Sequence, residues 1–383
     1  MFVSPSSHST GCINRKRLEL FQKTRTWLND GVRFQLRQVT ALGLALVLIA
    51  TLSTLTSCRN KKPTAAEERS PVLPLLEDLL KAGKPLFVSP EFLAFIPKQD
   101  AALTPTKEES LAAVQDPSFF YRMQREKHFS AIFLSPYAGS MKLANSLLSS
   151  PLWSLADVSP SGYIFRPIGA AAWGPPTLEL VERIHPDPAD RAAWLISTAA
   201  NLILLGKRDE AEQLLVMTAT TRKHPSLLLS TRASLSASRG QWNEAMTLAN
   251  ESLVKDRTNT AARTIQVRAL IECGRGDEAL EQVRRLVENS PNQESLFLLA
   301  RAANAAGDQE EEISALNRLV ALGTKDHQPL GASLTYLGQA YAKNGERGEA
   351  LRAFQKAIEA PELSDEQRKM IKELMDHIAL EKR

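Results

Sequence analysis

A short sequence pattern recurs at a fixed interval in the second half of the chain. Gly206, Gly240 and Gly274 lie 34 residues apart, and the segments that start at them read GKRDEA, GQWNEA and GRGDEA. Related segments, GDQEEE and GERGEA, start at Gly307 and Gly345. Self-similarity at such an interval is typical of proteins that stack one small structural unit many times. The repeat therefore predicts an array of like units rather than a single closed core.

Each repeat has the features of two helices that turn back on each other. A glycine after the first helix adopts the left-handed conformation that other residues resist, which reverses the chain. Small residues are expected where paired helices approach closely, and larger ones between successive hairpins. The small residues are Ala199, Ala211, Ala233, Ala245, Ala279, Ala300 and Gly338, and the larger ones are Leu215, Leu316 and Phe354.

The last unit, LTYLGQAYAKNGERGEALRAFQKAIEAPEL at residues 334–363, resembles the tetratricopeptide repeat consensus. The resemblance implies an all-α solenoid of about five helical hairpins over residues 188–363, with residues 364–383 as a polar capping helix. Pro225, Pro291 and Pro361 are predicted to stop the second helices of their hairpins.

Two features depart from the repeat pattern. Glu312 stands where other repeats have alanine, and the sequence GTKDHQPLG at residues 323–331 lengthens the connection before the fifth hairpin. We expect the array to bend or loosen at these points.

The tetratricopeptide resemblance also implies a binding surface. Such repeats hold extended peptides or partner helices along a concave face that the first helix of each hairpin lines. A basic stripe would form there from Arg268, Arg301 and Lys343. Such a stripe suits an acidic peptide or a carboxy-terminus. The alternative is that these charges are only solvated side chains on helix faces. Carried over by position, the lining residues are Thr264, Arg268, Phe297, Arg301, Asn304, Thr335, Gln339 and Lys343.

The N-terminal region contains a targeting segment. Residues 39–57, VTALGLALVLIATLSTLTS, carry no charge and follow Arg33 and Arg37. Their length is close to the roughly 20 residues of a membrane-spanning helix, so residues 1–58 are either a signal peptide or a retained anchor. The sequence LTSC at residues 55–58 resembles the lipobox of bacterial lipoproteins. This resemblance implies cleavage before Cys58 and lipidation of Cys58, with an uncleaved hydrophobic helix as the alternative.

A different pattern lies between the targeting segment and the repeats. Residues 59–70 are polar and mixed in charge, and they predict a linker. Residues 71–170 contain compact apolar runs that predict a small α/β domain, so the chain as a whole is α+β. The predicted elements are strands at 85–89 and 130–135 with a weakly patterned helix between them, a helix at 140–150, and a hairpin of strands at 153–158 and 162–167.

The sequence shows no pattern of catalytic or metal-binding residues. Its six histidines are scattered, without an HExxH motif or a pair at metal-ligand spacing, and it has no GxSxG, P-loop or GxGxxG motif. The three cysteines form no CxxC pair and predict no disulfide framework. The net charge of +4 is small, so composition does not indicate a nucleic-acid partner. We therefore expect no enzymatic activity, no metal and no cofactor.

Together these features predict a membrane-anchored, exported scaffold that binds partner proteins in the cell envelope through its repeats. Lipidated Cys58 or the N-terminal helix would hold it at the membrane, with the soluble part outside the cytoplasm. Two alternatives remain. Residues 150–167 resemble a pattern in extracytoplasmic domains of bacterial membrane glycosyltransferases, so an envelope enzyme or accessory factor acting on glycans through residues 71–170 is one. A single-pass membrane protein with its array in the cytoplasm is the other.

Overall fold

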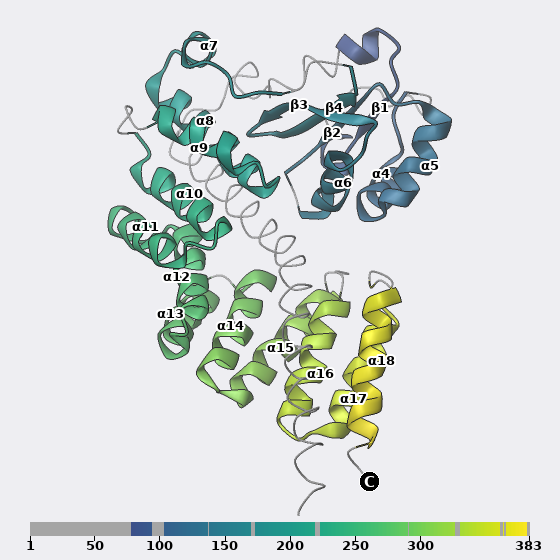
Figure 1. Ribbon diagram of the computed structural model, residues 1–383, viewed down its shortest axis with the longest axis vertical. Coiled ribbons are helices and arrows are strands. Elements are labelled where there is room, and N and C mark those ends of the chain that lie inside the picture. Colours follow the sequence, from purple (N-terminus) through teal and green to yellow (C-terminus); the bar gives the residue numbers. More distant parts are fainter. Residues whose placement is uncertain are drawn as a thin grey trace, which may run out of the picture. The chain divides into compact units, whose positions relative to one another are not determined.

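A computed structural model of the chain describes residues 78–93, 103–136, 138–169, 173–218, 223–289, 291–325, 330–360, 363 and 365–380. The chain divides into two compact units between Trp173 and Gly174, which we call unit 1 and unit 2 (Figure 1). The predicted targeting segment, its Cys58 and the predicted linker lie outside the described residues. Within the described ranges, no helix combines the length and the apolar character that crossing a membrane requires.

Unit 1 contains a four-stranded sheet with the strand order β1-β2-β4-β3. Strand β1 (Leu86–Val88) runs parallel to β2 (Ala131–Leu134), and β2 runs antiparallel to β4 (Gly162–Pro167). Strand β4 also pairs with β3 (Trp153–Ser159) in the predicted hairpin. Each predicted strand therefore overlaps a strand of the sheet.

Helices α4 (Lys107–Gln115) and α5 (Pro117–Lys127) occupy the weakly patterned stretch between β1 and β2. Thr106 begins α4, because its hydroxyl accepts a hydrogen bond from the Glu109 backbone while the Glu109 carboxylate accepts one from the Thr106 backbone. Asp116 caps α5 in a similar way. Local capping, rather than apolar periodicity, sets these two helices. Unit 1 also contains the short α3 (Pro90–Leu93) and the predicted helix α6 (Ala138–Leu148).

The centre of unit 1 is an aromatic cluster. Phe87 on β1 lies edge-on to Phe120 on α5, with the ring centroids 5.1 Å apart, and to Phe129 at 5.7 Å. The Phe120 ring also lies 6.4 Å from Trp153 on β3. All four side chains are buried. The cluster thus joins the sheet to a helix through residues that are far apart in the sequence.

Unit 2 is a helical solenoid. After α7 (Leu178–Ile184), its described residues form five helical hairpins and a terminal helix, α18 (Asp365–Leu380) (Figure 1). Consecutive helices pack against each other along the whole series. Hairpin 1 consists of α8 (Pro188–Leu204) and α9 (Arg208–Met217), hairpin 2 of α10 (Pro225–Ser238) and α11 (Trp242–Lys255), hairpin 3 of α12 (Thr260–Glu272) and α13 (Gly276–Asn289), hairpin 4 of α14 (Gln293–Ala306) and α15 (Gln309–Lys325), and hairpin 5 of α16 (Gly331–Lys343) and α17 (Arg347–Ile358).

The repeat glycines and alanines have the roles that the sequence predicted. The five glycines that follow the first helices all have φ between 74° and 82°, in the left-handed region. The alanines five residues later in hairpins 1 to 3 are fully buried. In hairpin 5, a methyl group at Gly338 would lie only 2.7 Å from the ring of Phe354, so any larger residue would have to displace this side chain.

One proline has a role different from the predicted one. Pro225 is the first residue of α10 and therefore begins a first helix instead of stopping a second helix. Its fixed φ suits the first helical turn, where the missing N–H would have had no partner. Pro291 lies between α13 and α14, and Pro361 falls outside the described residues.

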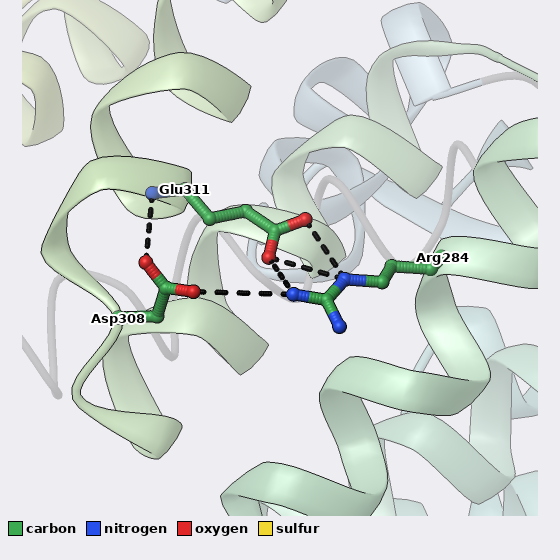
Figure 2. Close-up of polar contacts among 3 residues, drawn as sticks. All are labelled: Arg284, Asp308 and Glu311. Atoms are coloured by element: carbon green, nitrogen blue, oxygen red, sulfur yellow. Dashed lines mark hydrogen bonds and ion pairs between the residues drawn. The ribbon is translucent and has the colours of Figure 1, made fainter.

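Different polar contacts join successive hairpins. Between hairpins 2 and 3, the Asn259 amide donates to the Ser226 hydroxyl at 2.9 Å and to the Ser252 hydroxyl at 3.2 Å. Between hairpins 3 and 4, the Arg284 Nε donates to both carboxylate oxygens of Glu311 at 3.1 Å, as Figure 2 shows. A carboxylate oxygen of Asp308 lies 3.9 Å from the Nη2 atom of the same guanidinium. The first junction is neutral and mostly buried, whereas the second is charged and partly exposed.

Candidate functional site

The predicted lining residues lie on three successive first helices of unit 2. Helix α12 carries Thr264 and Arg268, and α16 carries Thr335, Gln339 and Lys343. Helix α14, which packs against α12, carries the remaining three, Phe297, Arg301 and Asn304. We name the surface that bears these eight residues the first-helix face.

An aromatic pair joins hairpins 4 and 5 on this face. The rings of Phe297 and Tyr336 meet edge to face, with centroids 5.3 Å apart. Burial raises the pKa of Tyr336 to about 12, although the positive charge of Arg301 acts in the opposite direction. The repeat pattern indicates Phe297 as a lining residue but not Tyr336, which directly follows the predicted Thr335. Both rings are only partly buried, so the pair leaves apolar surface exposed on this face.

Arg301 is paired with an acidic residue that the sequence analysis did not identify. Its Nη2 donates to the Glu272 carboxylate at 2.7 Å, which links α14 to α12. The Arg301 side chain is only 19% exposed. Its charge is therefore largely compensated within the protein, and the predicted basic stripe is weaker than its three cations indicate.

Glu312 compensates Lys343 and also binds Asn304. Its carboxylate accepts a hydrogen bond from the Asn304 amide at 2.5 Å and lies 3.5 Å from the Lys343 ammonium group. Glu312 is 8% exposed. The departure from alanine at this position, where we expected loosening, thus supplies a polar link between hairpins 4 and 5.

Arg268 has a different environment from the other two cations. Its guanidinium carbon lies 5.9 Å from the centre of the Trp242 ring, a cation–π contact. Its Nε is shielded from solvent and has no hydrogen-bond partner among the described residues. Burial, together with the charge of Arg301, lowers the pKa of Arg268 to about 10, whereas the charges of Glu294 and Glu272 act in the opposite direction.

Glu294, on the first turn of α14, is the acidic counterpart of Arg268. Burial raises the pKa of Glu294 to about 7, and the nearby charge of Arg268 only partly opposes this. A carboxyl group with such a pKa changes its charge near neutral pH. Glu294 was not among the predicted lining residues. It lies three residues before Phe297 and seven before Arg301, a spacing that places it on the same side of the helix and could have indicated it.

The remaining predicted residues offer less to a partner. Thr264 is buried, and the Thr335 hydroxyl donates to the Gly331 carbonyl of its own helix at 2.7 Å. Gln339 is half-buried on α16. In the described ranges, no group of three or more histidine, cysteine or acidic side chains is arranged to hold a metal ion. The chemistry of the face is therefore concentrated around Arg268 and the aromatic pair.

Comparison with known families identifies the repeats. A family model described as "Tetratricopeptide repeat" matches residues 266–327, and a second model with the same description matches residues 330–360. The chain contains tetratricopeptide repeats. Seven of the eight predicted lining residues fall within the matched ranges, and Thr264 falls just before them.

Solved structures of tetratricopeptide proteins are also similar to this chain. MamA from residue 41 to its end, from Desulfovibrio magneticus RS-1, is 20% identical, with coverage of 45% of this chain and 94% of MamA and a TM-score of 0.40. The protein TTC0263 of Thermus thermophilus is 16% identical, with coverage of 47% and 96% and a TM-score of 0.39. A comparison with curated proteins gives no match. Tetratricopeptide repeats indicate a protein-interaction scaffold.

Proposed function

We propose that this protein is a membrane-anchored scaffold, exported from the cytoplasm, that holds a partner protein on the first-helix face of tetratricopeptide repeats 3 to 5. The observation that carries the proposal is the composition of this face within the matched repeats. It combines the aromatic pair Phe297 and Tyr336 with Arg268, a cation that lacks an ion pair among the described residues. Aromatic and arginine side chains contribute most of the binding energy in many protein interfaces.

Photo-crosslinking tests the position of the partner. A photo-reactive amino acid at Gln339 is expected to crosslink to a partner protein in whole cells, since this side chain lies on the first-helix face. The matched control carries the same amino acid at Val254, which is 80% exposed on a second helix, α11. Equal crosslinking from both positions, or crosslinking from Val254 alone, would contradict the proposed surface.

Charge reversal tests the electrostatic part of the interaction. Changing Arg268 and Arg301 together to Glu is expected to abolish partner capture. Because Arg301 pairs with Glu272, the reversal also places two carboxylates side by side. The double change Arg301→Glu with Glu272→Arg therefore serves as a control, since it keeps the ion pair in the opposite sense. Unchanged capture in the Arg268 and Arg301 double variant would remove a charge-dependent groove.

The membrane anchor is tested separately. The support for lipidation is the apolar segment at residues 39–57 and the LTSC sequence that ends at Cys58. Fatty-acid labelling is expected to disappear in Cys58→Ala and to persist in Cys273→Ala. A chain that stays in the membrane fraction without any label would favour the retained helix instead.

A further inference from the structure

We infer that Arg268 binds one carboxylate of the partner, and that Phe297 and Tyr336 bind the apolar or aromatic side chain next to that carboxylate. The partner segment is thus a peptide with an Asp or Glu beside a large apolar residue. This inference rests on the proposed function and specifies the ligand of the same face.

Arg268 differs from the other cations of the first-helix face in having no acidic partner among the described residues. Arg301 has Glu272 at 2.7 Å and Lys343 has Glu312 at 3.5 Å. Arg268 has neither an ion pair nor a hydrogen bond with another described residue, and its Nε is shielded from water. Arg268 as a whole is half-buried, so a ligand carboxylate that reaches its guanidinium would supply the charged acceptor that no described residue supplies.

The Arg268 guanidinium is held by a contact with Trp242. Its central carbon lies over the Trp242 ring, 5.9 Å from the ring centre. A cation held over an aromatic face keeps its N–H donors available for other acceptors. The Trp242 contact therefore holds Arg268 in position for a carboxylate before the ligand arrives, which lowers the entropy lost on binding.

The charge of Glu294 acts on Arg268. Its ionised form would compete with the ligand carboxylate for Arg268. The charged and titratable groups that act on this region are Glu272 on α12, Arg301 on α14 and Tyr336 on α16, in addition to Arg268 itself. Because burial raises the pKa of Glu294 to about 7, the face carries less negative charge below that pH. A carboxylate ligand is then expected to bind more tightly as the pH falls through neutrality.

The aromatic pair supplies the neighbouring contact. Arg268 and Phe297 lie on α12 and α14, two helices that pack against each other, and the Phe297 ring contacts Tyr336 on α16. Phe297 and Tyr336 expose partly buried rings, which suit a flat apolar side chain. We therefore expect an extended peptide that crosses these helices to contact both Arg268 and the aromatic pair.

Peptide selection with the full-length chain in detergent tests the inference. Displayed random peptides of about twelve residues, long enough to cross two hairpins, are selected for binding. The selected peptides are expected to be enriched in Asp or Glu beside Phe, Tyr or Leu. Affinity for one such peptide is then measured by fluorescence anisotropy, together with a peptide in which Gln replaces the acidic residue.

Three variants distinguish recognition from a structural role. Arg268→Gln is expected to weaken binding of the acidic peptide by about tenfold or more, and to make the acidic and Gln peptides bind equally. Arg285→Gln, at an exposed arginine of α13, is the matched control and should leave both affinities unchanged. Glu294→Gln should strengthen binding of the acidic peptide above neutral pH and reduce its pH dependence, a gain that loss of structure would not produce.

Other results would contradict either the inferred ligand or the proposed function, and the two cases can be told apart. Selected peptides without acidic enrichment, or equal loss of both peptides in Arg268→Gln, would overturn the inference and leave the proposed function standing. Failure to select any peptide would remove the peptide-binding function itself. If circular dichroism shows that Arg268→Gln does not fold, Arg268→Lys and Glu294→Gln decide, and unchanged affinities in both would overturn the inference.

Discussion

Unit 1 and unit 2 differ in how far apart along the chain their contacting residues lie. In unit 1, the aromatic cluster brings Phe87, Phe120 and Trp153 together from β1, α5 and β3. In unit 2, packing occurs mainly between one helix and the next helices in sequence. Stability in such an array is approximately a sum of hairpin and junction contributions, whereas a single core loses its contacts together. The loss of stability caused by a core substitution should therefore extend through the whole of unit 1, whereas in unit 2 it should stay near the substituted hairpin.

The largest expected effect is in the core of unit 1. Phe120→Ala removes a fully buried ring from the cluster and should lower the free energy of unfolding by about 3–5 kcal/mol. Hydrogen exchange should accelerate in all four strands while helices α8 to α17 keep their protection. The control is Leu111→Ala on α4, where the side chain is 48% exposed. Faster exchange confined to α5 would contradict a single cooperative core.

A smaller, local effect is expected in hairpin 5. Gly338→Ala places a methyl group against Phe354 and should cost about 1–3 kcal/mol, with faster exchange mainly in α16, α17 and α18. Gly348→Ala is the matched control, since a methyl group there meets no atom within 4 Å. It should instead stabilise α17 by up to about 1 kcal/mol. Destabilisation of the same size by both changes would show that packing at Gly338 is not the cause.

The neutral junction between hairpins 2 and 3 should contribute about 1 kcal/mol. Asn259→Ser keeps an oxygen to cap α12 but removes the amide that donates to Ser226 and Ser252. Chemical denaturation should show this loss. Asn289→Ser is the control, because the exposed Asn289 amide donates to its own helix. Equal stability of Asn259→Ser and the natural chain would mean that the existing contact between the Ser226 and Ser252 hydroxyls, at 2.9 Å, is sufficient without the amide.

The smallest effect is expected at the charged junction in Figure 2. Arg284→Gln removes the contact with Glu311, and an ion pair this exposed contributes only about 0.2–1 kcal/mol. The loss should shrink at high salt, since salt screens exposed charges. Arg285→Gln, which breaks a pair within α13, is the comparison. A salt-independent loss in Arg284→Gln would indicate that its packing, not its charge, stabilises the junction.

The sequence predicts the repeats well because their signals are local. A left-handed glycine and a small alanine after it each act within a few residues. The strands of unit 1 were predicted because each is a compact apolar run, but α4 and α5 are set by the caps at Thr106 and Asp116. Such caps are short polar patterns that also occur in turns, so they gave no clear helix signal beforehand.

The site was predictable only in part. The repeat pattern places Arg301 and Lys343 on first helices, as the structure shows, but it does not show which side chain of a neighbouring helix lies opposite them. Glu272 and Glu312 were therefore missed as partners. Glu272 lies four residues after Arg268 on the same helix, a spacing that could have indicated its place on the face. Charge compensation between helices depends on how the hairpins stack, which the repeat pattern leaves open.

The carboxylate of Glu312 in hairpin 4 requires a cation at the position of Lys343 in the hairpin that follows it. In an array of identical repeats, any unit could follow any other, and copying a unit would lengthen the array without harm. Here, a hairpin 5 without Lys343, or a second copy of hairpin 4, would leave an acidic group in a nearly closed space without its cation. The order of these two units is thus set by a heterologous contact, and growth of the array by duplication is disfavoured at this point.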